Sequence, residues 1–183
     1  MGKNILVLEG SPRMDGNSDM LAEAFAEGAG GQGHEVSIIK VSCYRVNGCF
    51  ACSMCWNMGK PCVQSDDMEK IYPEIEQADA VVWVSPLYFF TWSTQLKAVI
   101  DRLYPYYLDR SPVKLKGKES ALILAAATDQ MAELKGIQET YRIMTEYMGW
   151  KNRGEMYACD VWEKGEVRHT DYLERARSLG ASF

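Results

Sequence analysis

The chain has 183 residues, of which 47% are hydrophobic and 25% are charged, and its formal net charge is −5. This length and apolar content predict a single domain over residues 1–183 with one well-buried core. The negative charge gives no broad attraction for nucleic acid or for an anionic membrane surface, so neither is an expected partner. Because no apolar run approaches a membrane span and no signal-peptide pattern is found, a cytoplasmic protein is expected.

A strand is expected over residues 3–9, and its continuous apolar centre predicts burial on both faces, as in a parallel sheet. The next segment is rich in Gly, Ser and Asn and predicts a sharp turn into a helix. Unpaired N–H groups and the positive end of a helix dipole converge in such a turn, which suits a phosphate group. The candidate donors are Ser11, Arg13, Asn17 and Ser18. The alternative is an ordinary strand-to-helix turn that Asn17 or Ser18 caps.

The rest of the chain alternates between helix and strand patterns. A helix over residues 20–29 stops at a Gly-rich turn, and a half-buried or edge strand follows over residues 34–41. Further strands are expected at residues 78–85, 119–126 and 153–159, and further helices at residues 67–77, 96–103, 133–148 and 172–179. This alternation predicts right-handed crossovers and a parallel sheet covered on both faces, which is a three-layer α/β sandwich.

Residues 42–65 lack periodicity and predict a long loop, and loops of this length usually carry function. Four of the six cysteines fall in it: Cys49, Cys52, Cys55 and Cys62. Because a cytosolic setting keeps thiols reduced, these four are candidate metal ligands or redox groups and not disulfide partners. Cys43 and Cys159 are expected to be small buried apolar residues.

Ligands of parallel α/β sheets lie at the carboxyl ends of the strands. Besides the first loop, these ends include residues 86–92 and 127–130. The first of the two segments carries Tyr88, Phe89, Phe90 and Trp92. Aromatic side chains at this position suit a flat ligand, and a dimer interface is the alternative, above all for Phe90 and Trp92.

Five short motifs, in this order along the chain, resemble the flavodoxin-like NAD(P)H-dependent FMN reductase family. They are GSPRMDGNS at residues 10–18, SDDM at 65–68, ADA at 78–80, SPLY at 85–88 and QLKAVIDR at 95–102. The resemblance covers residues 3–126, and the last third of the chain is similar only in its pattern of elements. It implies a flavodoxin-like fold, in which a five-stranded parallel sheet has the strand order 2-1-3-4-5.

The resemblance also implies a bound FMN and NAD(P)H as the electron donor. The FMN phosphate would lie in the loop at residues 11–18, and the isoalloxazine ring would rest on Pro86, Leu87, Tyr88 and Phe89. Thr128 would complete the pocket by its position after the fourth strand. Asp101 and Arg102 match the Asp-Arg pair of the family and are expected to form an ion pair at a helix end or an interface.

The spacing Cys49-x2-Cys52-x2-Cys55-x6-Cys62 resembles the compact cysteine motif of the iron–sulfur flavoproteins, a branch of the same superfamily. This resemblance implies a [4Fe–4S] cluster that exchanges electrons with FMN, because four thiolates in one loop are the ligands that such a cluster needs. The same thiols suit a closed tetrahedral zinc site, and free thiols are the third alternative.

The expected function is an FMN-dependent oxidoreductase that passes electrons from NAD(P)H to a quinone, a nitro compound or another small acceptor. No catalytic side chain is required, because the cofactor carries the chemistry. The alternatives are an iron–sulfur electron carrier fed by a ferredoxin-like protein and a flavodoxin-like binding module without catalysis. The aromatic residues favour a homodimer or homotetramer in which Phe90 and Trp92 help to cover the flavin of a neighbour.

Overall fold

Five parallel strands form the central sheet of the computed structural model, which describes residues 2–183. They are β1 (Asn4–Glu9), β2 (Glu35–Lys40), β3 (Ala80–Pro86), β4 (Glu119–Ala125) and β5 (Lys151–Ala158). Their order in the sheet is β2-β1-β3-β4-β5, and all neighbours are parallel. The predicted flavodoxin-like α/β fold and its strand order are confirmed.

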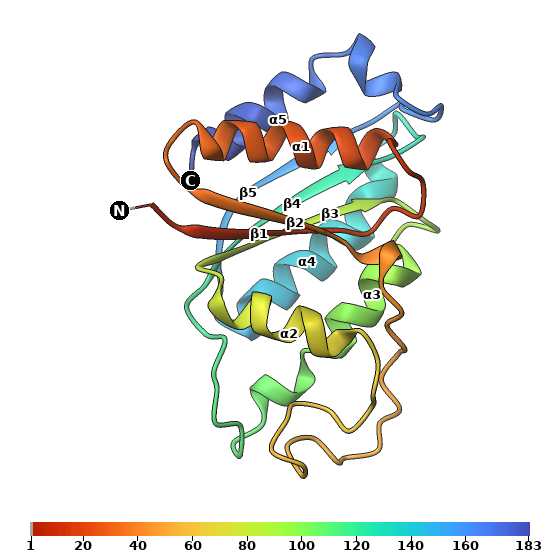
Figure 1. Cartoon of the computed structure of the whole chain (residues 1–183). Coiled ribbons are helices and arrows are strands. Elements are labelled where there is room, and N and C mark those ends of the chain that lie inside the picture. Colours follow the sequence, from red (N-terminus) through yellow and green to blue (C-terminus); the bar gives the residue numbers. More distant parts are fainter. Residues whose placement is uncertain (1) are drawn as a thin grey trace.

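Helices cover both faces of the sheet (Figure 1). One face carries α1 (Asn17–Gly30) and α5 (Tyr172–Ala181), and the other carries α2 (Met68–Gln77), α3 (Thr94–Asp101) and α4 (Lys135–Met148). Four short 3-10 helices connect them: η1 (Val41–Cys43), η2 (Tyr104–Tyr107), η3 (Met131–Leu134) and η4 (Glu166–His169). Within residues 2–183, every helix is too short or too polar to cross a bilayer.

The two faces of the sheet make two hydrophobic cores, because successive strand residues point to opposite sides. Ile5 and Val7 of β1 pack under α1, whereas Leu6 and Leu8 pack against the opposite helical layer. The central strand β3 is buried from Ala80 to Ser85, which explains its uninterrupted apolar sequence.

Trp92 belongs to the core, so the prediction that it lies in a dimer interface is wrong. Its side chain is 3% exposed and meets Trp83 and Tyr141 edge-on, with ring centroids 6.4 and 6.5 Å apart. The chain turns inward here because Ser93 donates its N–H to Ser85 Oγ at 3.0 Å and caps α3 by accepting the Leu96 N–H.

Two glycines let α1 and α5 touch backbone to backbone. A Cβ atom at Gly28 would collide with the carbonyl oxygen of Arg177, and one at Gly180 would collide with that of Phe25. Gly30, at the end of α1, faces open space.

We therefore expect Gly28→Ala to lower the free energy of unfolding by about 1–3 kcal/mol, because the helices must separate. Gly30→Ala is the matched control, and we expect it to be neutral or slightly stabilising, since alanine favours a helix. Urea denaturation of both variants measures the difference. Equal stability of the two variants would contradict the close contact.

Candidate functional site

The carboxyl ends of β1, β3, β4 and β5 bring four loops together at one edge of the sheet (Figure 1). These loops enclose a cavity of about 220 Å³. It is lined by Ser11, Arg13, Asn17, Ser18, Pro86, Leu87, Tyr88, Ala125, Ala127, Val161 and Trp162. The predicted phosphate residues and most of the predicted ring residues therefore share one cavity.

Phe89 and Thr128, the two remaining predicted residues, line an adjacent hollow of about 250 Å³. Leu87 and Ala127 line both spaces, so the two hollows adjoin. Val161 and Trp162 were missed by the sequence analysis. They follow β5, and extending the strand-end rule to the fifth strand would have included them.

The start of α1 leaves hydrogen-bond donors free at this cavity. Gly16 precedes the helix and donates its N–H to Asp19 Oδ2 at 3.2 Å, so neither Asn17 nor Ser18 is the cap. Their own N–H groups, in the first turn, have no hydrogen-bond partner among residues 2–183. Unpaired donors at the positive end of a 14-residue helix form a site for an anion.

The side chain of Asn17 is engaged within the chain. Its Nδ2 donates to the carbonyl oxygens of Val161 at 3.3 Å and Glu163 at 2.9 Å, and its Oδ1 accepts the Val167 N–H at 3.3 Å. Arg13 makes a second link, since Nη1 donates to the Trp162 carbonyl at 3.1 Å. Asn17 thus fixes the segment after β5 against α1, and its backbone N–H is the group left for an anion.

A strained aromatic turn stands beside the cavity. Tyr88 and Thr91 exchange two backbone hydrogen bonds of 3.0 and 3.1 Å, which leaves Phe89 and Phe90 as the central residues of a tight turn. Both have positive φ, 45° and 64°, where Asn and Gly are preferred, and Phe89 is 96% exposed. Strain of this kind is typical of functional sites. The homodimer or homotetramer stays a prediction, and Phe89 and Phe90 are among the exposed apolar side chains available to it.

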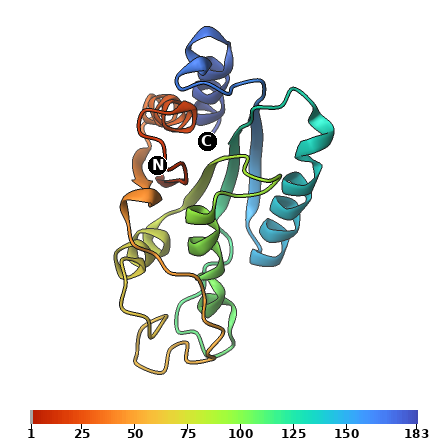
Figure 2. The ribbon, with the colours of Figure 1, turned by 90° about the vertical axis from the view of Figure 1, so that its right-hand side faces the viewer.

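The cysteine loop, residues 44–67, lies on the side of α2 and α3 that faces away from the sheet (Figure 2). All four of its cysteines line one cavity of about 510 Å³, which is also lined by residues of α3, η2 and α4. Burial raises the pKa of the Cys55 thiol, and the neighbouring Cys62 and Cys49 raise it further. Cys43 is exposed, contrary to expectation, because η1 buries Val41 and turns Cys43 outward.

The four thiols are not gathered into a ligand set in this conformation. Across residues 2–183, no three His, Cys, Asp or Glu side chains are grouped so that they could hold a metal ion. The backbone of the loop is nevertheless unusual, since Ala51, Ser53 and Trp56 have positive φ of 52°, 58° and 64°. Ala51 also donates its N–H to Cys49 Sγ at 3.4 Å. The metal site at these cysteines stays a prediction.

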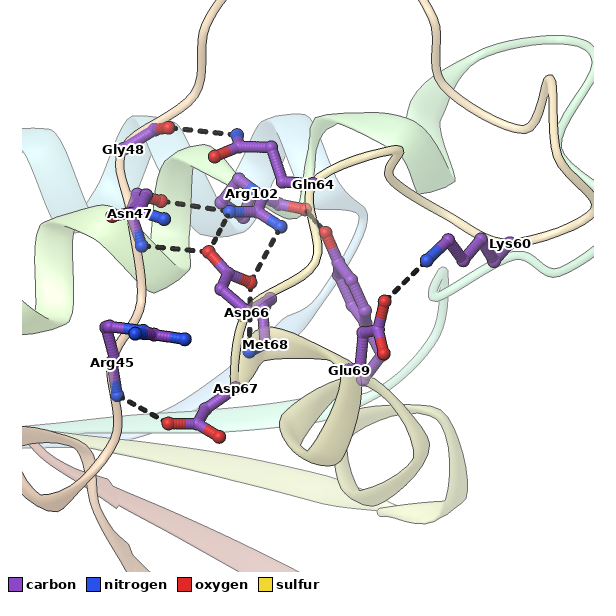
Figure 3. Close-up of polar contacts among 11 residues, drawn as sticks. Arg45, Asn47, Gly48, Lys60, Gln64, Asp66, Asp67, Met68, Glu69 and Arg102 are labelled. Atoms are coloured by element: carbon purple, nitrogen blue, oxygen red, sulfur yellow. Dashed lines mark hydrogen bonds and ion pairs between the residues drawn. The ribbon is translucent and has the colours of Figure 1, made fainter.

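A buried ion pair clamps both ends of this loop (Figure 3). Arg102 donates to Asp66 through Nη1 at 2.8 Å and Nη2 at 3.2 Å, and both side chains are at most 1% exposed. Asp66 also accepts the Asn47 N–H at 2.9 Å, and Arg102 donates to the Asn47 carbonyl at 3.0 Å. Burial raises the pKa of Asp66, but the hydrogen bonds from Arg102 and Asn47 outweigh it and hold that pKa below its usual range.

Comparison with known proteins identifies the family. The profile described as NADPH-dependent FMN reductase matches residues 3–159. The chain belongs to this family. An iron-sulfur flavoprotein of Archaeoglobus fulgidus is 36% identical over 118 residues, which are 64% of this chain and 52% of the relative, so the match spans about half of that relative. One from Methanocaldococcus jannaschii is 29% identical over 183 residues, covering 96% of this chain and 93% of the relative.

An iron-sulfur flavoprotein of Methanosarcina thermophila is 31% identical over 134 residues, which are 73% of this chain and 69% of the relative. The predicted oxidoreductase family, in its iron–sulfur flavoprotein branch, is thus confirmed. Among solved structures, an NAD(P)H:quinone oxidoreductase from Methanothermobacter marburgensis has a TM-score of 0.79 to this chain. The match covers 99% of this chain and 96% of the other, at 21% identity, and shows that the two share a fold.

The buried pair predicts a large effect of removing one charge. Asp66→Asn leaves the Arg102 guanidinium buried beside a neutral group, which we expect to cost about 3 kcal/mol. Asp101→Asn is the matched control, because the pair of Asp101 with Lys97 is exposed and we expect a change of about 0.5 kcal/mol or less. Urea denaturation of the two variants measures both. If Asp66→Asn were as stable as the control, the clamp would not exist in solution.

Proposed function

We propose that the protein binds FMN at the edge formed by β1, β3, β4 and β5 and passes electrons from NAD(P)H through it to a small acceptor such as a quinone or a nitro compound. The observation that carries this proposal is the pair of unpartnered N–H groups of Asn17 and Ser18 at the start of α1. These two groups suit the terminal phosphate of FMN.

The residues around this site, Ser11, Arg13, Asn17 and Ser18, form what we call the anion cup. Their side chains support the same placement of the phosphate. Ser11 Oγ accepts the Arg13 N–H at 3.1 Å, which leaves the hydroxyl proton of Ser11 free to donate. Arg13, held against the Trp162 carbonyl, adds a fixed positive charge at the rim of the cavity. A phosphate dianion would thus meet backbone donors, a hydroxyl and a guanidinium.

The ring of the flavin would rest against the segment after β3. The N–H groups of Leu87 and Tyr88 are already paired, with the carbonyls of Ala125 and Thr91. Those of Phe89 and Phe90 have no partner in the part of the chain that the structure describes, so they are the donors available to the polar edge of the ring. Bound FMN would supply the hydride and electron chemistry, and donors of this kind would stabilise the negative charge of a reduced ring.

Anaerobic mixing of the FMN-loaded protein with NADPH or NADH tests this proposal. We expect the absorbance of oxidised flavin to bleach and to return when a quinone is added. Flavin that neither nucleotide reduces, but that a reduced ferredoxin does reduce, would favour the electron carrier. A protein that cannot be loaded with FMN would favour the binding module.

Two asparagine variants test where the flavin binds. Asn17→Ala releases the segment after β5 from α1 and should weaken FMN binding at least about tenfold, or about 1.4 kcal/mol. Asn57→Ala, at an exposed position of the cysteine loop, should leave the affinity unchanged.

The cysteine loop favours a second candidate function, in which Cys49, Cys52, Cys55 and Cys62 hold a [4Fe–4S] cluster that exchanges electrons with FMN. The thiols line one cavity, and a backbone N–H already donates to Cys49 Sγ. Hydrogen bonds to sulfur and left-handed backbone turns are features of iron–sulfur sites. Cluster binding would require the loop to draw the four thiols together and Cys55 to lose its proton.

Anaerobic reconstitution with iron and sulfide, followed by iron, zinc and sulfide analysis, tests the cluster. We expect about four irons per chain in the wild type and in Cys43→Ser, whose exposed thiol lies outside the set, and a large loss in Cys52→Ser. Less than about one iron per chain in the wild type would overturn the cluster. Zinc at about one per chain in its place would assign the site to that metal.

A further inference from the structure

A buried carboxyl group lies beneath the loop that precedes α1. Glu9 is the last residue of β1, and its side chain is 1% exposed. Glu9 Oε1 accepts the Ser11 N–H at 2.7 Å. Glu9 Oε2 has no hydrogen-bond partner among residues 2–183 and lies 3.6 Å from Lys40 Nζ. A buried carboxyl group without a full set of partners is costly, and this one contacts Ser11, a residue of the anion cup.

Lys40 and Asp19 complete a network around this carboxyl group. Lys40, at the end of β2, donates from Nζ to both carboxylate oxygens of Asp19, at 2.5 and 2.6 Å, and to the Arg13 carbonyl at 2.8 Å. Asp19 in turn accepts the Gly16 N–H. The three side chains, from β1, β2 and α1, therefore hold the loop at Ser11, Arg13 and Gly16.

The charge of this network depends on the proton of Glu9. Lys40 on β2 and Asp19 on α1 are the charged groups that face Glu9, and its neighbour on β3 is the apolar Val84. Burial raises the pKa of Glu9 to about 8, the Ser11 N–H and Lys40 oppose the shift, and Asp19 adds to it. Burial lowers the pKa of Lys40, but its hydrogen bond to Asp19 and the two carboxylate charges outweigh it and raise that pKa, so Lys40 stays charged.

We propose that Glu9 couples the binding of a phosphate dianion in this cup to the uptake of a proton. The inference rests on the proposed binding of FMN there. With Glu9 ionised, two carboxylates face one ammonium group, and the excess negative charge lies under the residues that would hold the phosphate. A bound dianion repels this charge and therefore favours protonated Glu9.

The sign of the pH dependence follows from linkage. If the complex holds the proton of Glu9 more tightly than the free protein does, affinity is highest where Glu9 is already protonated and falls once it ionises. The second pKa of a phosphate monoester is about 6, so the ligand itself keeps a constant charge above about pH 7. We thus expect FMN affinity to fall by about tenfold or more between about pH 7 and about pH 9.5.

The test measures FMN binding to the full chain by fluorescence quenching over this pH range, for the wild type and for Glu9→Gln. Glutamine keeps an acceptor for the Ser11 N–H and cannot ionise. We expect the variant to match the wild type within about twofold near pH 7 and to bind at the same strength near pH 9.5. Glu23→Gln removes an exposed charge of α1 and should keep the wild-type slope.

Two further measurements separate this coupling from other effects. Riboflavin has the same ring without the phosphate, and we expect its affinity to be independent of Glu9. Calorimetry of wild-type FMN binding near pH 8, in two buffers of different ionisation enthalpy, should show a net uptake of protons, and this result needs no folded variant. No uptake, or a parallel loss of affinity in the wild type and Glu9→Gln, would overturn the coupling. FMN binding near pH 7 tests the proposed function separately.

Discussion

The parallel pairing of β1 with β2 and β3 is the constraint on which the rest of the structure depends. It aligns the carboxyl ends of the strands, so that Glu9 lies opposite Lys40 on one side and Val84 on the other. Each strand then continues into a loop at the same edge, and segments far apart in the sequence meet there (Figure 1). The anion cup, the aromatic turn and the network beneath the cup all follow from this alignment.

A second constraint acts on the cysteine loop. A long loop without regular structure has few backbone hydrogen bonds of its own, and here the Asp66–Arg102 pair supplies a shared anchor for both of its ends (Figure 3). The desolvation of two charges makes such a pair weak as a source of stability, but the loss of either partner is costly. The anchor fixes where the loop starts and ends and leaves the segment with the cysteines a conformation of its own.

The strand order was implied by the resemblance to the family. The alternation of strands and helices and the residues of the cup could be predicted because they depend on local patterns: continuous apolar runs, a Gly-rich turn and the strand-end rule. The role of the Asn17 side chain could not, since its partners Val161 and Val167 lie 144 and 150 residues away. Trp92 was wrongly predicted because its inward turn depends on the contact of Ser93 with Ser85, which local patterns do not reveal. The burial of Glu9 was not predicted, because a lone acid after an apolar run is typical of an exposed strand end.

A crystal structure of the protein grown with FMN tests the central claim most directly. The account predicts phosphate oxygens within hydrogen-bond distance of the N–H groups of Asn17 and Ser18, and the flavin ring against Pro86 and Leu87. A flavin whose phosphate lies away from the start of α1, or that occupies the cavity beside the cysteines, would contradict it.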